Sequence, residues 1–332
     1  MVSRFGGPDK ANGNLFLWAL LIATSIPALV ILAIQHVLPS SDGFQALFVT
    51  ILFLGSGAHV ASSSFFYWDP DARSMLLKSP TRYFVAPIVI IVGLSLLFAF
   101  GSSEVRASLT VFYFIWQTHH YTRQNLGILS FASRATQTAP PSVLEQSAVL
   151  TAGVGGVLGM ITLQTPYAST FLDGYAWEIN AMAVLVYGAA GVLLLASIPN
   201  QLKEGSVWRF LFFFLGVVFY LPTFLFKDVI SAILTYAIAH GIQYLVFMFY
   251  VAWRNNHSTE SLRRRLVTLS ILTLGGAALL ESMQRSIWGS LNEAIFGAYL
   301  ALVITHFIVD AGVWRLREAA PRAYMKERFR FL

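Results

Sequence analysis

The sequence contains no cysteine and very few charged residues. Asp, Glu, Lys and Arg together make up 11% of the 332 residues, whereas soluble domains carry about 25%. The absence of thiols excludes disulfides, iron–sulfur clusters, thiolate-ligated haem and cysteine nucleophiles. The low charged fraction, together with a hydrophobic fraction of 56%, excludes an ordinary soluble domain. We therefore predict an all-α, polytopic integral membrane protein. We expect no nucleic-acid partner, although the net charge is +6.

Apolar runs long enough to cross a bilayer as a helix, about 20 residues, occur repeatedly. We predict ten spans, at residues 15–37, 45–67, 83–101, 107–132, 146–164, 180–198, 209–226, 229–253, 266–282 and 294–314. The whole chain, residues 1–332, is therefore expected to form a single transmembrane domain. Residues 315–332 form a basic tail, in which six bases are mixed with three aromatic residues. We expect this tail to contact anionic lipids at the membrane surface.

The distribution of basic residues predicts the orientation. If the N-terminus is cytoplasmic, eighteen of the 22 Lys and Arg residues fall on the cytoplasmic side of the ten spans. Only Arg106, Lys227 and Arg285 fall outside, and Arg123 lies within a span. This bias follows the positive-inside rule. We expect both termini to be cytoplasmic and the membrane to be a bacterial-type inner (plasma) membrane, with membrane lipids as partners.

Five of the seven histidines lie inside predicted spans, on four helices that all run from outside to inside. They are His59, His119, His120, His240 and His306. At 1.5 Å per residue, they lie ~12–20 Å from the cytoplasmic ends of their helices, so they occupy one layer of the membrane. We predict all five as metal ligands. The other two histidines, at positions 36 and 257, fall at a helix end and in a loop, where we expect no role.

Polar residues follow three of these histidines at a spacing of four. Gln124 follows His120, Tyr244 follows His240, and Asp310 follows His306 by one turn, which places each pair on one helix face. Three polar residues are therefore predicted to support or use the metal site, with Tyr244 and Asp310 as catalytic groups and Gln124 near the cofactor.

Two further residues complete the predicted site. Arg123 is the only base, and Asp310 the only carboxylate, that lies well inside a predicted span. Ionisable groups in spans are candidates for function by default, so we predict Arg123 as a catalytic residue that pairs with Asp310. Gln243 lies beside Tyr244 and is predicted to contact the cofactor.

Neutral imidazole is the commonest protein ligand for iron, copper and zinc. Adjacent histidines on a helix point about 100° apart, so His119 and His120 would serve either one ion and its surroundings or two ions. No HExxH motif occurs, which disfavours zinc hydrolysis. We therefore expect one or two non-haem iron ions. Haem b is the alternative, because Gly55, Gly57 and Gly241 leave room for a ring.

The motifs His306-Phe-Ile-Val-Asp310 and His119-His120-Tyr-Thr-Arg123 resemble those of the Brp/Blh-type carotenoid-cleaving dioxygenases of membranes. They also resemble His-rich membrane iron oxygenases more broadly. In these enzymes, too, histidines are spread over several helices. The resemblance implies an iron-dependent oxygenase that acts on a lipid-soluble substrate.

Three functions fit these observations. The first is a metal-dependent oxidoreductase of the oxygenase type, supplied by an electron donor protein. The second is a transporter or proton-coupled channel that uses the His, Arg and Asp residues as a relay. The third is a haem b electron-transfer subunit. Two observations weigh against transport. The chain shows no repeat between its halves, and the histidines lie at one depth rather than along a path across the bilayer.

Overall fold

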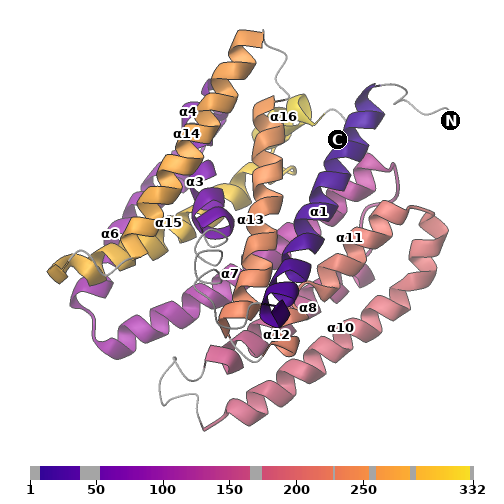
Figure 1. The fold of residues 1–332 in the computed structure, drawn as a ribbon. Helices are drawn as coiled ribbons and strands as arrows, with labels where there is room; N and C mark the ends of the chain where they lie inside the picture. The colour runs from indigo at the N-terminus through magenta and orange to yellow at the C-terminus, as the bar shows by residue number, and fades with distance from the viewer. Residues whose placement is uncertain are drawn as a thin grey trace. The chain divides into compact units, whose positions relative to one another are not determined.

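The computed structural model describes residues 8–37, 53–164, 174–226, 229–253, 259–284 and 289–329. Within these ranges all regular structure is helical and no strand occurs (Figure 1). The all-α prediction is confirmed for this part of the chain. The chain divides into two compact units, one built mainly from residues 1–39 and 107–240 and the other from residues 40–106 and 241–330.

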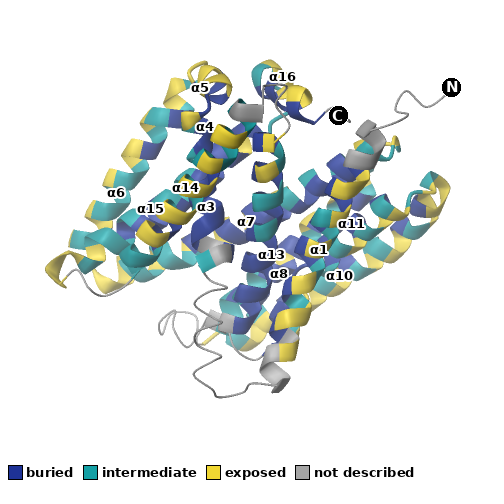
Figure 2. Cartoon of the chain, turned by 45° about the horizontal axis from the view of Figure 1, so that its top comes forward, coloured by how far each residue is buried: buried dark blue, intermediate teal, exposed yellow. Residues whose placement is uncertain are grey.

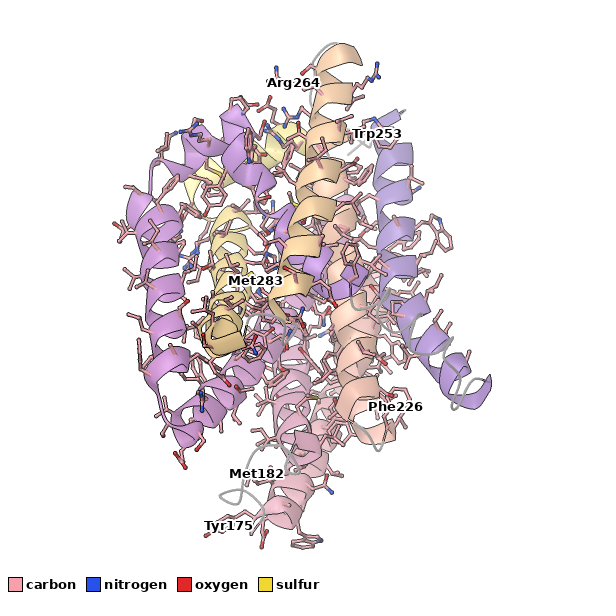
Figure 3. All side chains as sticks on the ribbon, turned by 60° about the vertical axis from the view of Figure 1, so that its left-hand side comes forward. Tyr175, Met182, Phe226, Trp253, Arg264 and Met283 are labelled. Carbon is pink, nitrogen blue, oxygen red and sulfur yellow. The ribbon has the colours of Figure 1, made fainter. Side chains whose placement is uncertain are left out.

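The helices of the first unit come from the N-terminus and the middle of the chain. They are α1 (Pro8–Val37), most of α7 (Ser103–Ala135), α8 (Val143–Gln164), α10 (Ala176–Glu204), α11 (Val207–Val218) and α12 (Pro222–Leu225). Helix α13 (Val229–Trp253) begins in this unit and continues past His240 into the second. Phe226, just before α13, and Trp253, its last residue, lie toward opposite ends of this helix (Figure 3).

The second unit contains shorter elements as well as long helices. They are η1 (Phe53–Ala58), α3 (His59–Ser62), α4 (Phe65–Trp68), α5 (Pro70–Leu76), η2 (Thr81–Val85), α6 (Ala86–Phe100), α14 (Thr259–Gln284), η3 (Gly289–Leu291), α15 (Asn292–Val313) and α16 (Ala319–Arg328). Helix α15 packs along α6, and α14 packs along η1 and α3.

Seven of the described helical segments are long and apolar enough to cross a membrane. They are Gly13–Ile31, Thr81–Phe100, Val143–Leu163, Ala176–Glu204, Ser231–Trp253, Ser261–Gln284 and Gly289–Val313. An integral membrane protein built from helices is thus supported. Helices α6 and α10 expose much of their surface (Figure 2), including Ile88 and Leu185. Apolar side chains on such faces are suited to contact lipid. By contrast, most of the apolar stretch of α13 is buried.

The remaining predicted spans differ from simple apolar helices. Helix α7 has 33 residues but carries the polar stretch of residues 116–125, so its mean hydropathy is low. The predicted span 209–226 is interrupted, because α11 ends at Val218 and Pro222 begins α12, as expected where proline lacks an N–H donor. The predicted span 45–67 falls partly on residues 38–52, which lie outside the described ranges.

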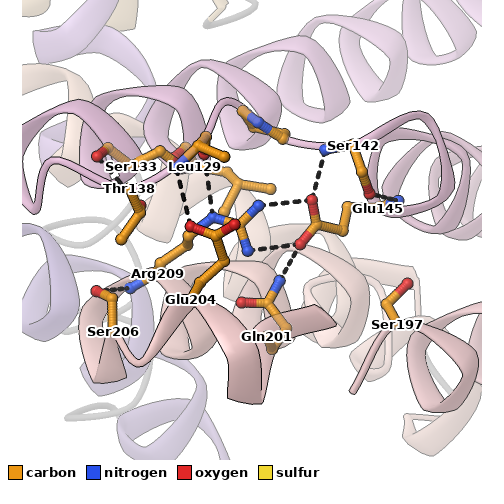
Figure 4. A network of polar contacts seen from close by, with 12 residues as sticks. Leu129, Ser133, Thr138, Ser142, Glu145, Ser197, Gln201, Glu204, Ser206 and Arg209 are labelled. Carbon is orange, nitrogen blue, oxygen red and sulfur yellow. Dashed lines mark hydrogen bonds and ion pairs between the residues drawn. The ribbon is translucent and has the colours of Figure 1, made fainter. Parts of the chain in front are cut away.

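A buried ion pair joins three helices of the first unit (Figure 4). The Arg209 guanidinium on α11 donates to both carboxylate oxygens of Glu145 on α8, at 2.6 and 2.7 Å. The Gln201 amide on α10 donates to the same carboxylate. Glu145 also accepts from the Ser142 backbone N–H, while Ser142 Oγ accepts from the Glu145 N–H, which is a capping box at the start of α8. The Glu145 carboxylate therefore caps the N-terminus of α8 and also joins α8 to α10 and α11.

The basic tail folds back onto the second unit. Arg328, on α16, is fully buried and bonds Asp69 and Asp71 at the start of α5. The Tyr324 hydroxyl donates to Asp69 at 3.0 Å, and burial raises the pKa of this phenol well above its usual range. Phe329 packs on the Trp314 ring. These side chains are occupied by contacts within the protein, and contact of the tail with lipid stays a prediction.

Candidate metal centre

Three of the five predicted histidines bring ring nitrogens close together. One nitrogen from each of His59, His240 and His306 lies within 4.8 Å of the other two. All three side chains are buried, with at most 2% of their surface exposed. His240 is the last residue of the first unit in this segment. Gly241, the next residue in the unbroken helix α13, already belongs to the second unit. We refer to these residues as the three-histidine group.

The group is compatible with a metal ion in its donor chemistry and its dimensions. The rings of His59 and His306 have centroids 4.9 Å apart and meet edge to face at 81°. Nitrogens that share one ion at about 2.0–2.1 Å from it lie roughly 3.4 Å from each other. The nitrogens of this group lie within 4.8 Å of one another, so the rings would have to move together to share one ion.

Hydrogen bonds to the other ring nitrogen orient two of these imidazoles. His59 Nδ1 lies 2.6 Å from the Gly55 carbonyl oxygen, and a carbonyl only accepts, so Nδ1 carries the proton. His306 Nδ1 lies 2.6 Å from Ser63 Oγ. Ligating histidines usually make such a bond through the nitrogen that does not bind the metal. In both residues this leaves Nε2 as the atom suited to bind an ion.

Glycines allow the backbone to approach closely here. A Cβ atom on Gly241 would lie 2.0 Å from the Gly55 carbonyl oxygen, and one on Gly57 would lie 3.4 Å from the Ala277 backbone. Gly55 and Gly57 lie in the π-helical turn η1, directly before His59, and such widened turns often mark functional sites. The space that glycine leaves at position 241 is thus filled by the Gly55 backbone rather than open to a ring.

The two adjacent histidines of α7 face different environments. His120 is buried, and its ring centroid lies 4.9 Å from that of His240 at an interplanar angle of 80°. The Tyr121 ring packs on His240 at 4.2 Å. His119 is exposed and lies against Trp116. His120 therefore contacts a member of the three-histidine group, whereas His119 points away from the interior. Their roles as ligands stay predictions.

The predicted supporting residues have varied partners. The Gln124 side chain donates to the His240 backbone carbonyl at 3.2 Å, which fixes the backbone of α13. Gln243 is buried, with 1% exposed. The Tyr244 hydroxyl lies 2.9 Å from Ser63 Oγ. A direct contact with a cofactor stays a prediction for each of them.

The two predicted charged residues differ in burial. Asp310 is buried, and its carboxyl group is hydrogen-bonded to the side chains of Tyr244 and Trp314. Arg123 is exposed on α7. Because the two belong to different units, their pairing stays a prediction.

Sequence reasoning missed Ser63 and Trp314, although a signal was present for both. Ser63 follows His59 by four residues, and Trp314 follows Asp310 by four, the same spacing that identified Tyr244 and Asp310. Serine and tryptophan are common in apolar helices, so their hydrogen-bonding role becomes visible only once the partner on another helix is known.

The comparisons with known proteins give no family for this chain: no family model, no curated protein and no solved structure matches it.

Proposed function

We propose that this protein is a membrane-integral, metal-dependent oxidoreductase of the oxygenase type that holds iron at His59, His240 and His306. The observation that carries the proposal is the cluster of three buried ring nitrogens within 4.8 Å. Neutral imidazole suits iron, copper and zinc. A bound iron ion would supply one-electron and dioxygen chemistry. Since His240 and His306 lie in candidate membrane spans, the substrate is proposed to be lipid-soluble, and an electron donor protein to supply reducing equivalents.

Two observations refine the proposed cofactor. The His120 ring, packed against His240, offers a fourth imidazole for the same ion or for a second one. The close approach of Gly241 to the Gly55 carbonyl supports non-haem iron over haem b, because a haem ring needs open space beside its ligands.

We further propose that the chain crosses a bacterial inner membrane ten times, with both termini in the cytoplasm. The excess of Lys and Arg on one side supports this orientation. Because the chain has no cysteine, single substitutions such as Asn256→Cys and Leu332→Cys give clean labelling sites. Both are expected to be protected from an impermeant thiol reagent added outside intact cells. Labelling of either site from outside would contradict the orientation.

Metal content tests the function. Purified wild-type protein, loaded with Fe²⁺ without oxygen and desalted, is expected to retain iron in stoichiometric amount by elemental analysis. His59→Ala, His240→Ala and His306→Ala each remove one ligand and should lower retention strongly. His257→Ala is the control, since its position in a loop between predicted spans gives it no expected role. This control should retain iron like the wild type.

Three results would contradict the proposal. A haem absorption band in the purified protein would favour the electron-transfer subunit. Failure of the wild type to retain iron, copper or zinc would favour the transporter or channel. Equal retention by the wild type and all three alanine variants would place the metal elsewhere.

A further inference from the structure

Ser63 connects two helices of the second unit through its hydroxyl group. Its Oγ lies 2.6 Å from His306 Nδ1 on α15 and 2.9 Å from Tyr244 Oη on α13. All three side chains are buried, with 5% or less exposed. The residue directly follows α3, which carries His59. Residues far apart in sequence thus meet at a single hydroxyl.

The connection extends from Tyr244 to a carboxyl group. Asp310 is hydrogen-bonded to the Tyr244 side chain and to the Trp314 side chain. An indole N–H can only donate, and a carboxyl group can only accept when it is ionised. With Asp310 ionised, Tyr244 gives its single hydroxyl hydrogen to Asp310 and accepts from Ser63. Ser63 in turn has no further hydrogen and has to accept from His306.

This order determines which nitrogen of His306 carries the proton. A serine hydroxyl has one hydrogen, and it is committed to Tyr244. Nδ1 of His306 then has to be the N–H donor, and the lone pair resides on Nε2. We propose that Ser63, Tyr244 and the ionised carboxylate of Asp310 are positioning groups that fix His306 in the Nδ1–H tautomer and present Nε2 to the three-histidine group.

His59 reaches the same state by a local route. Its Nδ1 bonds the Gly55 carbonyl oxygen four residues earlier. Two histidines on different helices thus present the same nitrogen, one through its own backbone and one through a chain of side chains. The agreement is what a metal site requires, because an ion binds the lone pair and not the N–H group.

The buried carboxyl group has a physical reason to lie at the end of this chain. A carboxylate in a membrane span is costly unless donors satisfy it, and Tyr244 and Trp314 both do so. An acceptor at the far end polarises the hydrogen bonds toward it and makes the imidazole a stronger ligand. The importance of these hydrogen bonds for metal binding rests on the proposed function. The tautomer of His306 does not depend on it.

The tautomer can be measured without metal. Metal-free protein with ¹⁵N-labelled histidine is examined by NMR at pH 9.5, well above the ordinary pKa values of histidine and of carboxyl groups. The His306 signals are assigned by their loss in His306→Ala. In the wild type, Nδ1 is expected to be protonated and Nε2 unprotonated. Ser63→Ala removes the acceptor and should give a mixture of both tautomers. His59, bonded to Gly55, should not change in this variant and serves as an internal reference.

A neighbouring serine provides the matched control. Ser62 is also buried, but its hydroxyl donates to the His59 backbone carbonyl and takes no part in the series of hydrogen bonds from His306 to Asp310. Ser62→Ala should therefore leave the His306 tautomer unchanged. If Ser63→Ala does not fold, Tyr244→Phe interrupts the chain one step later and should also populate the second tautomer. A wild-type His306 protonated on Nε2, or a tautomer unaffected by both variants, would overturn the inference.

Metal affinity separates this inference from the proposed function. Ser63→Ala is expected to weaken Fe²⁺ binding roughly 10- to 100-fold, while Ser62→Ala should not. If the wild type binds no metal but the tautomer responds as expected, the proposed function fails and the positioning role stands. If iron binds and the tautomer does not respond, the positioning role fails and the metal site stands.

Discussion

Removing Arg209 should destabilise the first unit severely. Its guanidinium is 2% exposed and its partner Glu145 is 0% exposed. The substitution Arg209→Met keeps the approximate length of the side chain but deletes both hydrogen bonds to the carboxylate. Glu145 would then remain buried with only the Gln201 amide and the Ser142 N–H as donors.

The expected magnitude follows from the burial of both partners. Breaking a buried ion pair by removing one member typically costs about 3–5 kcal/mol, because the other charge stays desolvated and unpaired. The ratio of folded to unfolded protein should therefore fall by about two to four orders of magnitude. Removing the second charge as well, in Arg209→Met/Glu145→Gln, should restore much of the loss, since a neutral amide costs far less to bury than a carboxylate. Glutamine also preserves the capping box with Ser142.

The measurement is reversible unfolding in mixed detergent micelles with increasing SDS, followed by circular dichroism. The matched control is Arg82→Met, because the Arg82–Glu318 pair is also an Arg–carboxylate contact but has side chains 30% and 35% exposed. Pairs of that kind contribute at most about 1 kcal/mol. Equal losses in Arg209→Met and Arg82→Met would refute the argument from burial. A double variant no more stable than Arg209→Met would show that the two residues are not coupled.

Two further predictions concern the second unit. Gly241→Ala places a methyl group where the Gly55 carbonyl lies, 2.0 Å from the new Cβ; because that contact is with backbone, the helices must separate, and iron retention should fall although no ligand is lost. Gly93→Ala, with open space around it, should retain iron normally. Hydrogen bonds from Arg82 hold the pKa of Glu318 below its ordinary value of 4.5, so this contact should stabilise the protein above pH 4.5 and lose its effect as the pH falls toward the lowered folded-state pKa. The difference in unfolding midpoint between the wild type and Glu318→Gln should accordingly shrink on acidification, and a difference that grows in acid would reverse the assigned sign.

The candidate site was partly accessible from the sequence. A spacing of four residues predicts a shared helix face from local geometry alone, and it connected His306 with Asp310 and His240 with Tyr244. The same rule separated His119 from His120, because adjacent helical residues point in different directions. Nothing in the sequence, however, indicates that Ser63 meets His306, since that contact joins residues 243 positions apart.

The buried Arg209–Glu145 pair was missed for a related reason. The apolar runs place Glu145 just before one predicted span and Arg209 at the start of another, where charged residues are ordinary. Their burial depends on how α8, α10 and α11 pack together, with Ala148, Ala152 and Ala190 in the shared core. Small side chains permit such close packing, but they do not specify which helices will meet.

The sequence by itself determined that this protein is helical, because a membrane core forces each backbone polar group to be satisfied within its own segment. It also excluded cysteine as a ligand, since the chain has none, and left histidine as the candidate ligand. Tertiary structure decided which histidines come together, with His59, His240 and His306 in one group and His119 exposed. It also brought Gly241 against the Gly55 backbone and placed the Ser63 hydroxyl between His306 and Tyr244. Helix propensity and hydropathy are local properties of the chain, whereas these contacts are made between segments, and their geometry exists only after the helices have packed.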